Sequence, residues 1–181
     1  NLADKGATLF SYEATSGETL VPGVSLVVDF AKASRILSLD CDFLETDPIG
    51  SSKAFSAKRQ GGNENYDQEG DVNPAKMNRL YQVETQFSLT GGMADHRLRV
   101  APSRVELIAG AMAAAFGISS FKVEAEDKKA LFPGAEDPEG EFESWIAECK
   151  NDLETAGTGA LVLAGSRQSK VVKQIAAALN E

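Results

Sequence analysis

Three carboxylates stand at the ends of apolar runs of the sequence, where they could contact a ligand. Asp40 and Asp42 follow the run RILSL, and Glu84 ends the run RLYQVE. Parallel strands bring such residues to the carboxyl edge of a sheet, where a carboxylate can accept hydrogen bonds from ribose hydroxyls or from the donor edge of guanine. The three residues are therefore candidate binding contacts.

Two glycine-containing segments could supply hydrogen-bond donors to an anion. The loop SLTGG carries the hydroxyls of Ser88 and Thr90 and two unhindered backbone N–H groups, which are the kinds of donor that approach phosphate. A tight turn before the last helix offers a second set, from Gly165, Ser166 and Arg167. Each segment can equally be an ordinary surface connection, so both interpretations stay open.

No residue of the sequence stands out as a catalyst. His96 is the only histidine and it follows Asp95, but adjacent side chains of an extended segment point to opposite faces and do not form a dyad. The sequence has no G-x-S-x-G elbow, Walker loop or G-x-G-x-x-G fingerprint, which are the usual support for hydrolase, ATPase and NAD-dependent activities. We therefore expect the isolated domain to catalyse nothing.

The elements that position these residues alternate between strand and helix. Apolar runs predict strands at 7–13, 34–41, 79–84, 97–100, 118–123 and 159–164. Helical spacing and capping residues predict helices at 51–56, 103–116, 138–153 and 171–179. The alternation predicts an α/β fold with a mainly parallel sheet, right-handed crossovers and helices on both faces. Ligands of such sheets bind beyond the carboxyl ends of the strands, so the polar segments are expected to converge there.

The helix boundaries rest on particular capping signals. Ser103 and Glu106 form an S-x-x-E capping box, and Gly117 stands where a left-handed C-terminal cap belongs. Asp137 is expected to cap the next helix, with Pro138 at its first position. The side chains expected to face the core from the last two helices are Phe142, Trp145, Ile146, Cys149, Leu153, Val171, Val172, Ile175 and Leu179.

The composition predicts a globular protein that does not bind nucleic acid. The chain has 181 residues, of which 43% are hydrophobic and 25% charged, enough for a full core. A net charge of −9 opposes nonspecific binding to nucleic acid, which depends on Lys and Arg. Cys41 and Cys149 lack metal-ligand spacing and are interpreted as packing residues rather than a disulfide. No apolar run reaches the roughly 20 residues of a membrane-spanning helix.

The chain is predicted to form a single α/β domain over residues 1–181. Within it, 58–78 is expected to be a polar loop or an insertion, and Pro133 and Pro138 are expected to limit regular structure in the acidic connector 124–139. The sequence begins without Met or a signal pattern. We therefore expect it to be an internal fragment of a larger chain.

The stretch RLYQVETQFSLTGGMADHRLRVAPSRVELIAGAM resembles a segment of the molybdopterin oxidoreductase superfamily. In that family a strand runs into D-P-R-x-T-x-T-A-x-x-A-D and then into a P-G-T-D helix start. Here Glu84 stands at the family Asp, Ser88 and Thr90 at its two Thr positions, and Ala94 and Asp95 at its A-D. The upstream run SRILSLDCDFLETDP is similar to the strand and loop that face the guanosine.

The more specific resemblance is to the large iron–sulfur and molybdopterin-like subunit of alternative complex III and related quinol-oxidising complexes, through LSLDCDFL, MNRLYQVE, FSLTGGMADHRLR and LVLAGSRQ. It implies a Rossmann-like domain, as in the central domains of formate dehydrogenase and DMSO reductase type proteins. The cofactor contacts implied are Asp40, Asp42, Glu84, Ser88, Thr90, Asp95, Gly165 and Ser166.

The same resemblance implies a place in respiratory electron transport. The expected partners are other domains of the same chain and the iron–sulfur and membrane subunits of a respiratory complex, with the iron–sulfur clusters elsewhere in the full-length chain. The resemblance implies association with a bacterial cell membrane, on the periplasmic side if a twin-arginine leader outside these residues exports the protein. No metal ligand is expected among these residues.

The sequence departs from the family pattern at contacts that matter for the cofactor. Thr85 stands at the family Pro and Gln86 at its Arg, and the P-G-T-D start has become PSRV from Pro102. A charged contact and a carboxylate of the family are therefore missing. The subfamily most similar to this chain is thought to keep the fold and lack the metal cofactor, which agrees with these changes.

Three hypotheses follow from these residues. The favoured one is a degenerate, mainly structural cofactor-domain module of an iron–sulfur-associated oxidoreductase subunit, with no cofactor bound by this fragment. The alternative is a functional cradle for molybdopterin guanine dinucleotide in an active oxidoreductase. A third is an independent nucleotide-binding or receiver-like regulatory domain, suggested by Asp40 and Asp42 beside a strand; it lacks the expected strand-end Lys and the order of the phospho-acceptor.

Overall fold

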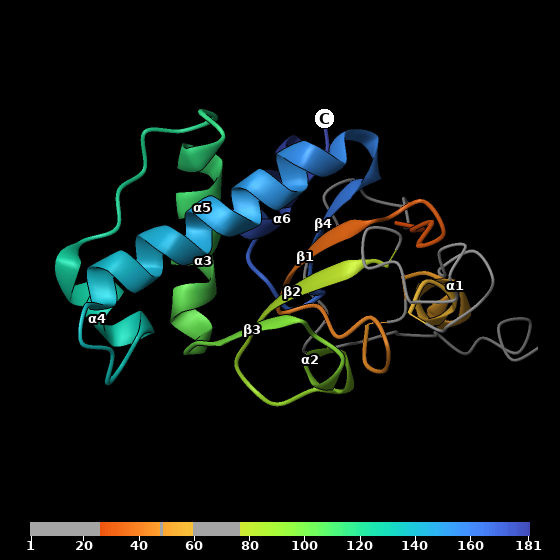
Figure 1. The fold of residues 1–181 in the computed structure, drawn as a ribbon, viewed down its shortest axis with the longest axis horizontal. Helices are drawn as coiled ribbons and strands as arrows, with labels where there is room; N and C mark the ends of the chain where they lie inside the picture. Colours follow the sequence, from red (N-terminus) through yellow and green to blue (C-terminus); the bar gives the residue numbers. More distant parts are fainter. Residues whose placement is uncertain (1–25, 48, 60–76) are drawn as a thin grey trace, which may run out of the picture.

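A four-stranded parallel sheet forms the centre of the protein. The computed structural model describes residues 26–47, 49–59 and 77–181, and its strands are β1 (Arg35–Leu39), β2 (Arg79–Glu84), β3 (His96–Arg99) and β4 (Ala160–Ala164). They lie in the order β3-β2-β1-β4, and every neighbouring pair is parallel (Figure 1). This is the order of the first four strands of the doubly wound fold. The predicted Rossmann-like α/β fold is confirmed.

The central strands are apolar on both sides because both faces of the sheet are covered. In register, Leu37 of β1 lies between Tyr81 of β2 and Val162 of β4, and all three belong to the core on one face. The next residues along these strands, Ile36, Leu80 and Leu163 among them, belong to a second core on the other face. This alternation explains why β1 and β2 read as continuous apolar runs.

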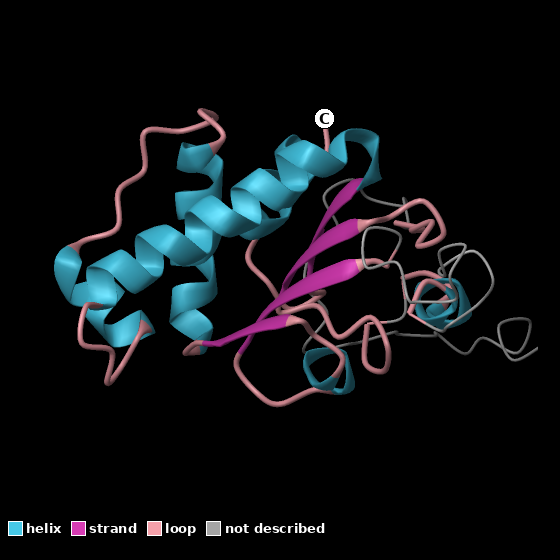
Figure 2. Cartoon of the chain, viewed as in Figure 1, coloured by secondary structure: helices cyan, strands magenta, loops and turns pink. Residues whose placement is uncertain are grey.

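Helices cover the two faces unequally (Figure 2). The first face carries α3 (Val105–Ala115), α5 (Pro138–Ala156) and α6 (Lys170–Leu179), with α4 (Ala125–Leu131) packed against α5. The other face carries α1 (Ser52–Ala57), whose Phe55 stacks edge-on with Phe43 at 5.1 Å between ring centroids. The four-residue α2 (Leu89–Gly92) lies between β2 and β3.

Several predicted boundaries are confirmed by the caps. Asp137 accepts a hydrogen bond from the N–H of Gly140 at 3.0 Å, with Pro138 in the first turn of α5. Gly117 has a φ of +74°, which favours glycine after α3. The face of α5 is also as predicted, with Trp145 half-buried and four fully buried side chains, Phe142, Ile146, Cys149 and Leu153.

The predicted capping box of α3 is wrong. Pro102 to Arg104 form a 3-10 turn, and α3 begins at Val105 without a side-chain cap. Glu106 has another partner, because its carboxylate accepts a hydrogen bond from the hydroxyl of Ser169 at 2.9 Å. That bond joins the start of α3 to the start of α6.

Two further predictions about the outer layer are wrong. Residues 118–123 do not form a strand; Phe121 lies over α3, where a Cβ on Gly110 would come within 2.6 Å of its ring. The connector 124–139 contains α4, because AEDKKAL is a run of helix formers with acidic residues first and basic residues last. Pro133 follows the end of α4 and Pro138 begins α5, so neither proline interrupts a helix.

Val171 was expected to face the core, but its side chain is exposed, because Val172 takes the inward position at the start of α6. The predicted strand at 7–13 lies outside the described residues, as does most of the predicted loop or insertion at 58–78. Over the ranges that the structure describes, no helix combines the length and the apolar character needed to cross a membrane.

Candidate functional site

The carboxyl ends of β1, β2 and β4 meet at a pocket of about 420 Å³. The order of the strands reverses at β1, because the chain adds β2 and β3 on one side of it and β4 on the other. Such switch points are where open α/β sheets bind ligands. The three predicted polar segments do converge here, and the lining residues are Asp40, Asp42, Glu45, Thr46, Gln82, Glu84, Thr85, Gln86, Phe87, Ser88, Pro102, Arg167 and Gln168.

Asp40 joins the three segments of the pocket. It directly follows β1 and has a φ of +55°, and its carboxylate accepts hydrogen bonds from the Thr85 N–H at 3.3 Å and from the Gln168 side chain at 2.7 Å. Burial raises the pKa of Asp40, although these two hydrogen bonds partly oppose the shift. Gly165 packs so closely that a Cβ there would overlap the carbonyl oxygen of Asp40.

Asp42 is held by the hydroxyls and backbone of two threonines. One carboxylate oxygen accepts from the Thr90 hydroxyl at 2.7 Å and from its N–H at 3.1 Å, and the other accepts from Thr46. Burial opposes ionisation of Asp42, but these hydrogen bonds outweigh it, so the pKa of the carboxyl lies below its usual range. Asp42 therefore stays ionised while facing the pocket.

Glu84 is the most buried carboxylate of the pocket, with 2% of its side chain exposed. It forms an ion pair with Arg97 from the neighbouring strand β3 and accepts a hydrogen bond from the Ser88 hydroxyl at 2.5 Å. The Arg97 guanidinium lies 4.9 Å from the centre of the Phe87 ring. A Cβ on Gly91 would overlap the Glu84 carboxylate, so this glycine is required for close approach.

The donors of the predicted anion loop are used inside the protein. The Ser88 hydroxyl donates to Glu84 and accepts from the Gly91 N–H at 2.9 Å. The Thr90 hydroxyl donates to Asp42 and accepts from the Leu44 N–H at 3.1 Å. The Gly92 N–H is bound to the Ser88 carbonyl. These groups do not fit a phosphate, because their hydrogen atoms already have partners and the neighbouring side chains are carboxylates.

Two buried oxygen atoms of the pocket lining have no hydrogen-bond partner among the described residues: Oε1 of Gln82 and Oγ1 of Thr85. Gln82 is fully buried in β2. Its Nε2 lies 3.5 Å from a carboxylate oxygen of Glu84, which fixes the nitrogen on that side, because the opposite orientation would set two acceptors against each other.

The other predicted contacts lie outside the pocket. Gly165 is buried and donates its N–H to the Leu39 carbonyl, whereas Ser166 is exposed and donates its N–H to Asp47 at 3.2 Å; neither residue lines the pocket. Asp95 is a correction: it lies at the amino end of β2, where it accepts from the Leu80 N–H at 2.7 Å. It precedes β3 directly, so the parallel sheet places it at the opposite edge.

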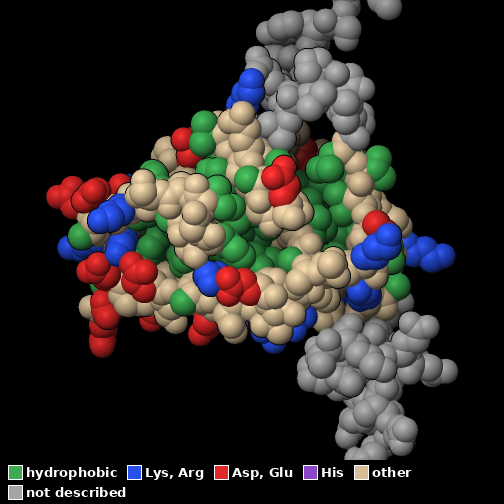
Figure 3. Space-filling model, turned by 90° about the horizontal axis from the view of Figure 1, so that it is seen from above, with side chains coloured by type: hydrophobic (Ala, Val, Ile, Leu, Met, Phe, Trp, Pro, Cys, Tyr) green, Lys and Arg blue, Asp and Glu red, His purple; other side chains and the backbone are tan. Residues whose placement is uncertain are grey.

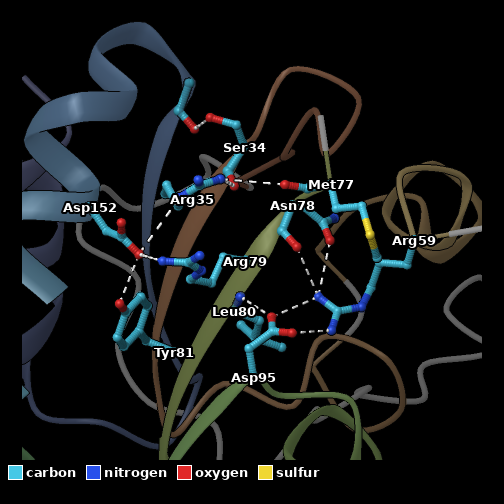
Figure 4. Close-up of polar contacts among 11 residues, drawn as sticks. Ser34, Arg35, Arg59, Met77, Asn78, Arg79, Leu80, Tyr81, Asp95 and Asp152 are labelled. Atoms are coloured by element: carbon cyan, nitrogen blue, oxygen red, sulfur yellow. Dashed lines mark hydrogen bonds and ion pairs between the residues drawn. The ribbon is translucent and has the colours of Figure 1, made fainter. Parts of the chain in front are cut away.

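That opposite, amino edge is a network of ion pairs (Figure 4). Asp152 of α5 accepts from Arg79 at 2.7 Å and from the Tyr81 hydroxyl at 2.8 Å, and Arg35 lies 3.7 Å away. Burial opposes ionisation of Asp152, but these donors outweigh it and lower its pKa. This network was not predicted from the sequence; the arginines that begin β1 and β2 were the available signal for it.

The same edge holds a second ion pair. Arg59 binds Asp95 through both of its terminal nitrogens, at 2.9 and 2.7 Å. The pKa of Asp95 lies below its usual range because the bonds from Arg59 and Leu80 outweigh the effect of burial. Asp95 is therefore a structural carboxylate that ties the end of α1 to the start of β2.

Gln82, Thr85 and Gln168 were not among the contacts predicted from the sequence, where Thr85 was noted only as a departure from the family pattern. A glutamine inside the buried strand RLYQVE was the one available signal for Gln82. Among the described residues no three His, Cys, Asp or Glu side chains are grouped closely enough to hold a metal ion. Cys41 and Cys149 are buried, unpaired thiols, and burial raises the pKa of both.

The fold and the pocket define this chain as a Rossmann-like α/β protein with an acidic pocket at the carboxyl edge of its sheet. No protein-family model matches the sequence, and no curated protein matches it either.

Proposed function

We propose that this chain is a cofactor-domain module of a molybdopterin-family, iron–sulfur-associated oxidoreductase subunit, and that it serves structure and assembly in respiratory electron transfer. The proposal begins from the sequence resemblance around Glu84, Ser88 and Thr90. In this view the module keeps the fold of a cofactor domain and has lost the contacts to the cofactor. Its partners are the remaining domains of its own chain and the iron–sulfur and membrane subunits.

The observation that favours a degenerate site is the internal use of the loop donors. Ser88 and Thr90 stand at the two threonine positions of the family, yet they donate to Glu84 and Asp42. A guanine dinucleotide carries a diphosphate, which needs free N–H and O–H donors or cations. Arg167 is the only cation in the pocket lining, against four carboxylates. The described residues therefore do not fit the diphosphate.

Two measurements test this proposal. Calorimetric titration of the 181-residue chain with GMP should show no heat of binding up to millimolar nucleotide. Elemental analysis of the full-length protein in its complex should show iron but neither molybdenum nor tungsten. Binding of GMP that is lost in Asp42→Asn would favour the alternative, a working dinucleotide cradle. Molybdenum or tungsten in stoichiometric amount would overturn the degenerate site directly.

A further inference from the structure

The pocket offers acceptors that lack donors. Gln82 is fully buried and its Oε1 has no hydrogen-bond partner, and the same is true of the Thr85 hydroxyl oxygen, as far as the described residues reach. Both residues line the pocket. A buried acceptor without a partner costs free energy, and a native protein keeps such a group where a ligand or water can satisfy it. Oε1 of Gln82 can only accept a hydrogen bond, and the Thr85 hydroxyl can accept one as well as donate one, so a ligand that donates hydrogen bonds can satisfy both atoms.

The charge of the lining points to the same kind of ligand. Asp40, Asp42, Glu45 and Glu84 are carboxylates, whereas Arg167 is the only cation among the lining residues. Arg97, from behind the lining, neutralises Glu84. Four negative groups against these two positive ones leave an excess of two negative charges. Opposite charge attracts strongly in a partly enclosed site, and an anionic ligand would be repelled.

The spacing of these carboxylates favours an organic cation over a metal ion. A Ca²⁺ or Mg²⁺ site needs several oxygen ligands within about 2.6 Å of one point. In the described part of the chain no three His, Cys, Asp or Glu side chains are grouped closely enough to hold a metal ion, while the pocket measures about 420 Å³. A guanidinium group spreads five N–H donors over a plane and has no acceptor, so it complements separated carboxylate, amide and hydroxyl oxygens.

We propose that this pocket binds the guanidinium or primary ammonium group of an organic cation, with Gln82 and Thr85 accepting hydrogen bonds from it and Asp40 and Asp42 supplying the opposite charge. The group can come from a free small molecule or from an Arg or Lys side chain of a peptide. The proposal is independent of the role in a respiratory subunit. It concerns only the chemistry that these four side chains recognise.

The test is a calorimetric titration of the 181-residue chain with agmatine, which carries both cationic groups. Agmatine should bind at low ionic strength, and Thr85→Val and Asp40→Asn should each weaken binding at least tenfold. Glu148→Gln is the matched control, because it removes one negative charge from an exposed position on α5 and should change affinity less than twofold. Thermal melts followed by circular dichroism establish that every variant is folded.

Further titrations identify the source of the cation and test whether anions compete for the pocket. An arginine peptide blocked at both ends that binds more tightly than agmatine indicates a protein side chain, and the reverse order indicates a free amine. Inorganic phosphate and GMP should not displace agmatine at equal concentration. The proposal is overturned if agmatine shows no binding at 10 mM, if Glu148→Gln weakens it as much as Asp40→Asn, or if phosphate competes.

Discussion

Apart from Glu84, which pairs with Arg97, the carboxylates at the two edges of the sheet are held in opposite ways. At the amino edge Asp152 and Asp95 are bound by arginines, so each negative charge has a positive partner. At the carboxyl edge Asp40 and Asp42 are bound by hydroxyl, amide and N–H groups, which satisfy hydrogen bonds but leave the charge in place. A carboxylate that is only hydrogen-bonded to neutral groups keeps its negative charge and can attract a cation. A carboxylate that is paired with an arginine has its charge neutralised and contributes to the structure of its edge.

A separate group of acidic side chains lies in the helical layer, on α4 and α5. Figure 3 shows acidic side chains gathered at the end of the molecule that carries α4 and the start of α5, where the first turns contain Glu126, Asp127, Glu139 and Glu141. Lys128 lies among them and binds Glu139 and Glu143 at 2.9 and 2.6 Å. The two glutamates of these pairs are exposed, and ion pairs with exposed partners contribute about 1 kcal/mol or less each to the free energy of unfolding.

The largest expected effect comes from a substitution that forces the backbone apart at the carboxyl edge. Gly165→Ala places a Cβ on the carbonyl oxygen of Asp40, and backbone cannot move aside as a flexible side chain can. We expect a loss of about 3 kcal/mol in the free energy of unfolding, measured by urea denaturation. Gly92→Ala is the control, because its Cβ would meet only the tip of the Phe87 ring at 3.4 Å. Equal losses in both variants would contradict the close approach at Asp40.

A somewhat smaller effect is expected at the amino edge. Asp152→Asn removes the charge that binds Arg79 and leaves Arg35, whose side chain is 17% exposed, without its carboxylate. Because Arg79 is partly in solvent, we expect a loss of about 2 kcal/mol in the free energy of unfolding. Denaturation at 1 M NaCl checks the cause, since salt should shrink the difference between the variant and the parent. A difference that salt leaves unchanged would indicate lost packing instead.

The pH dependence of stability should separate the two edges. Asp152 has a lowered pKa in the folded protein, so its contribution is complete above the unfolded value of about 3.9 and is lost as the pH falls through the folded value. Asp40 has a raised pKa. The folded state therefore takes up this proton first, and the contribution of Asp40 to stability increases as the pH falls toward about 3.9.

Two variants test this difference by urea denaturation between pH 3 and pH 7. In Asp152→Asn the free energy of unfolding should fall less steeply below about pH 3.9 than it does in the parent protein. In Asp40→Asn the rise in the free energy of unfolding that the parent shows as the pH is lowered toward about 3.9 should be absent. If both variants change the same pH range, the contrast between a neutralised and a hydrogen-bonded carboxylate is wrong.

The smallest effect is expected where the pocket has an oxygen without a partner. Thr85→Val removes Oγ1, which has no hydrogen-bond partner among the described residues, so the free energy of unfolding should change by about 0.5 kcal/mol or less. Thr90→Val is the matched contrast, because it leaves Asp42 and the Leu44 N–H without the buried hydroxyl between them. It should cost about 2 kcal/mol. A similar loss for both would mean that Thr85 has a structural partner.

The sequence was sufficient to predict the sheet because three of its strands are apolar runs that end in polar residues. The strands predicted at 34–41, 79–84 and 159–164 correspond to β1, β2 and β4, and the rule that carboxyl ends form sites placed Asp40 and Glu84 correctly. The segment 118–123 has a composition typical of a strand but packs on α3. Whether such a segment joins the sheet depends on the tertiary structure and not on its own residues.

The partners of the site residues could not be predicted in the same way. Asp42 and Thr90 are 48 positions apart, and Asp40 and Gln168 are 128 positions apart, so no local pattern shows that they meet. The loop SLTGG has the composition of an anion site whether its donors point outward or are used inside. Asp95 shows the converse error, because its place in a motif suggested the pocket while its position before β3 sets it at the other edge.

The contact between Arg59 and Asn78 makes the stretch between these two residues a suitable place for an insertion. The Arg59 guanidinium donates to the backbone and side-chain oxygens of Asn78, both at 3.1 Å, although the two residues are 19 positions apart. Asn78 in turn donates to the Phe55 carbonyl, so hydrogen bonds join the start of β2 to α1 and to Arg59 just after it. Because the entropy of closing a loop rises slowly with its length, an epitope tag or a reporter domain inserted between these anchors should leave the sheet intact.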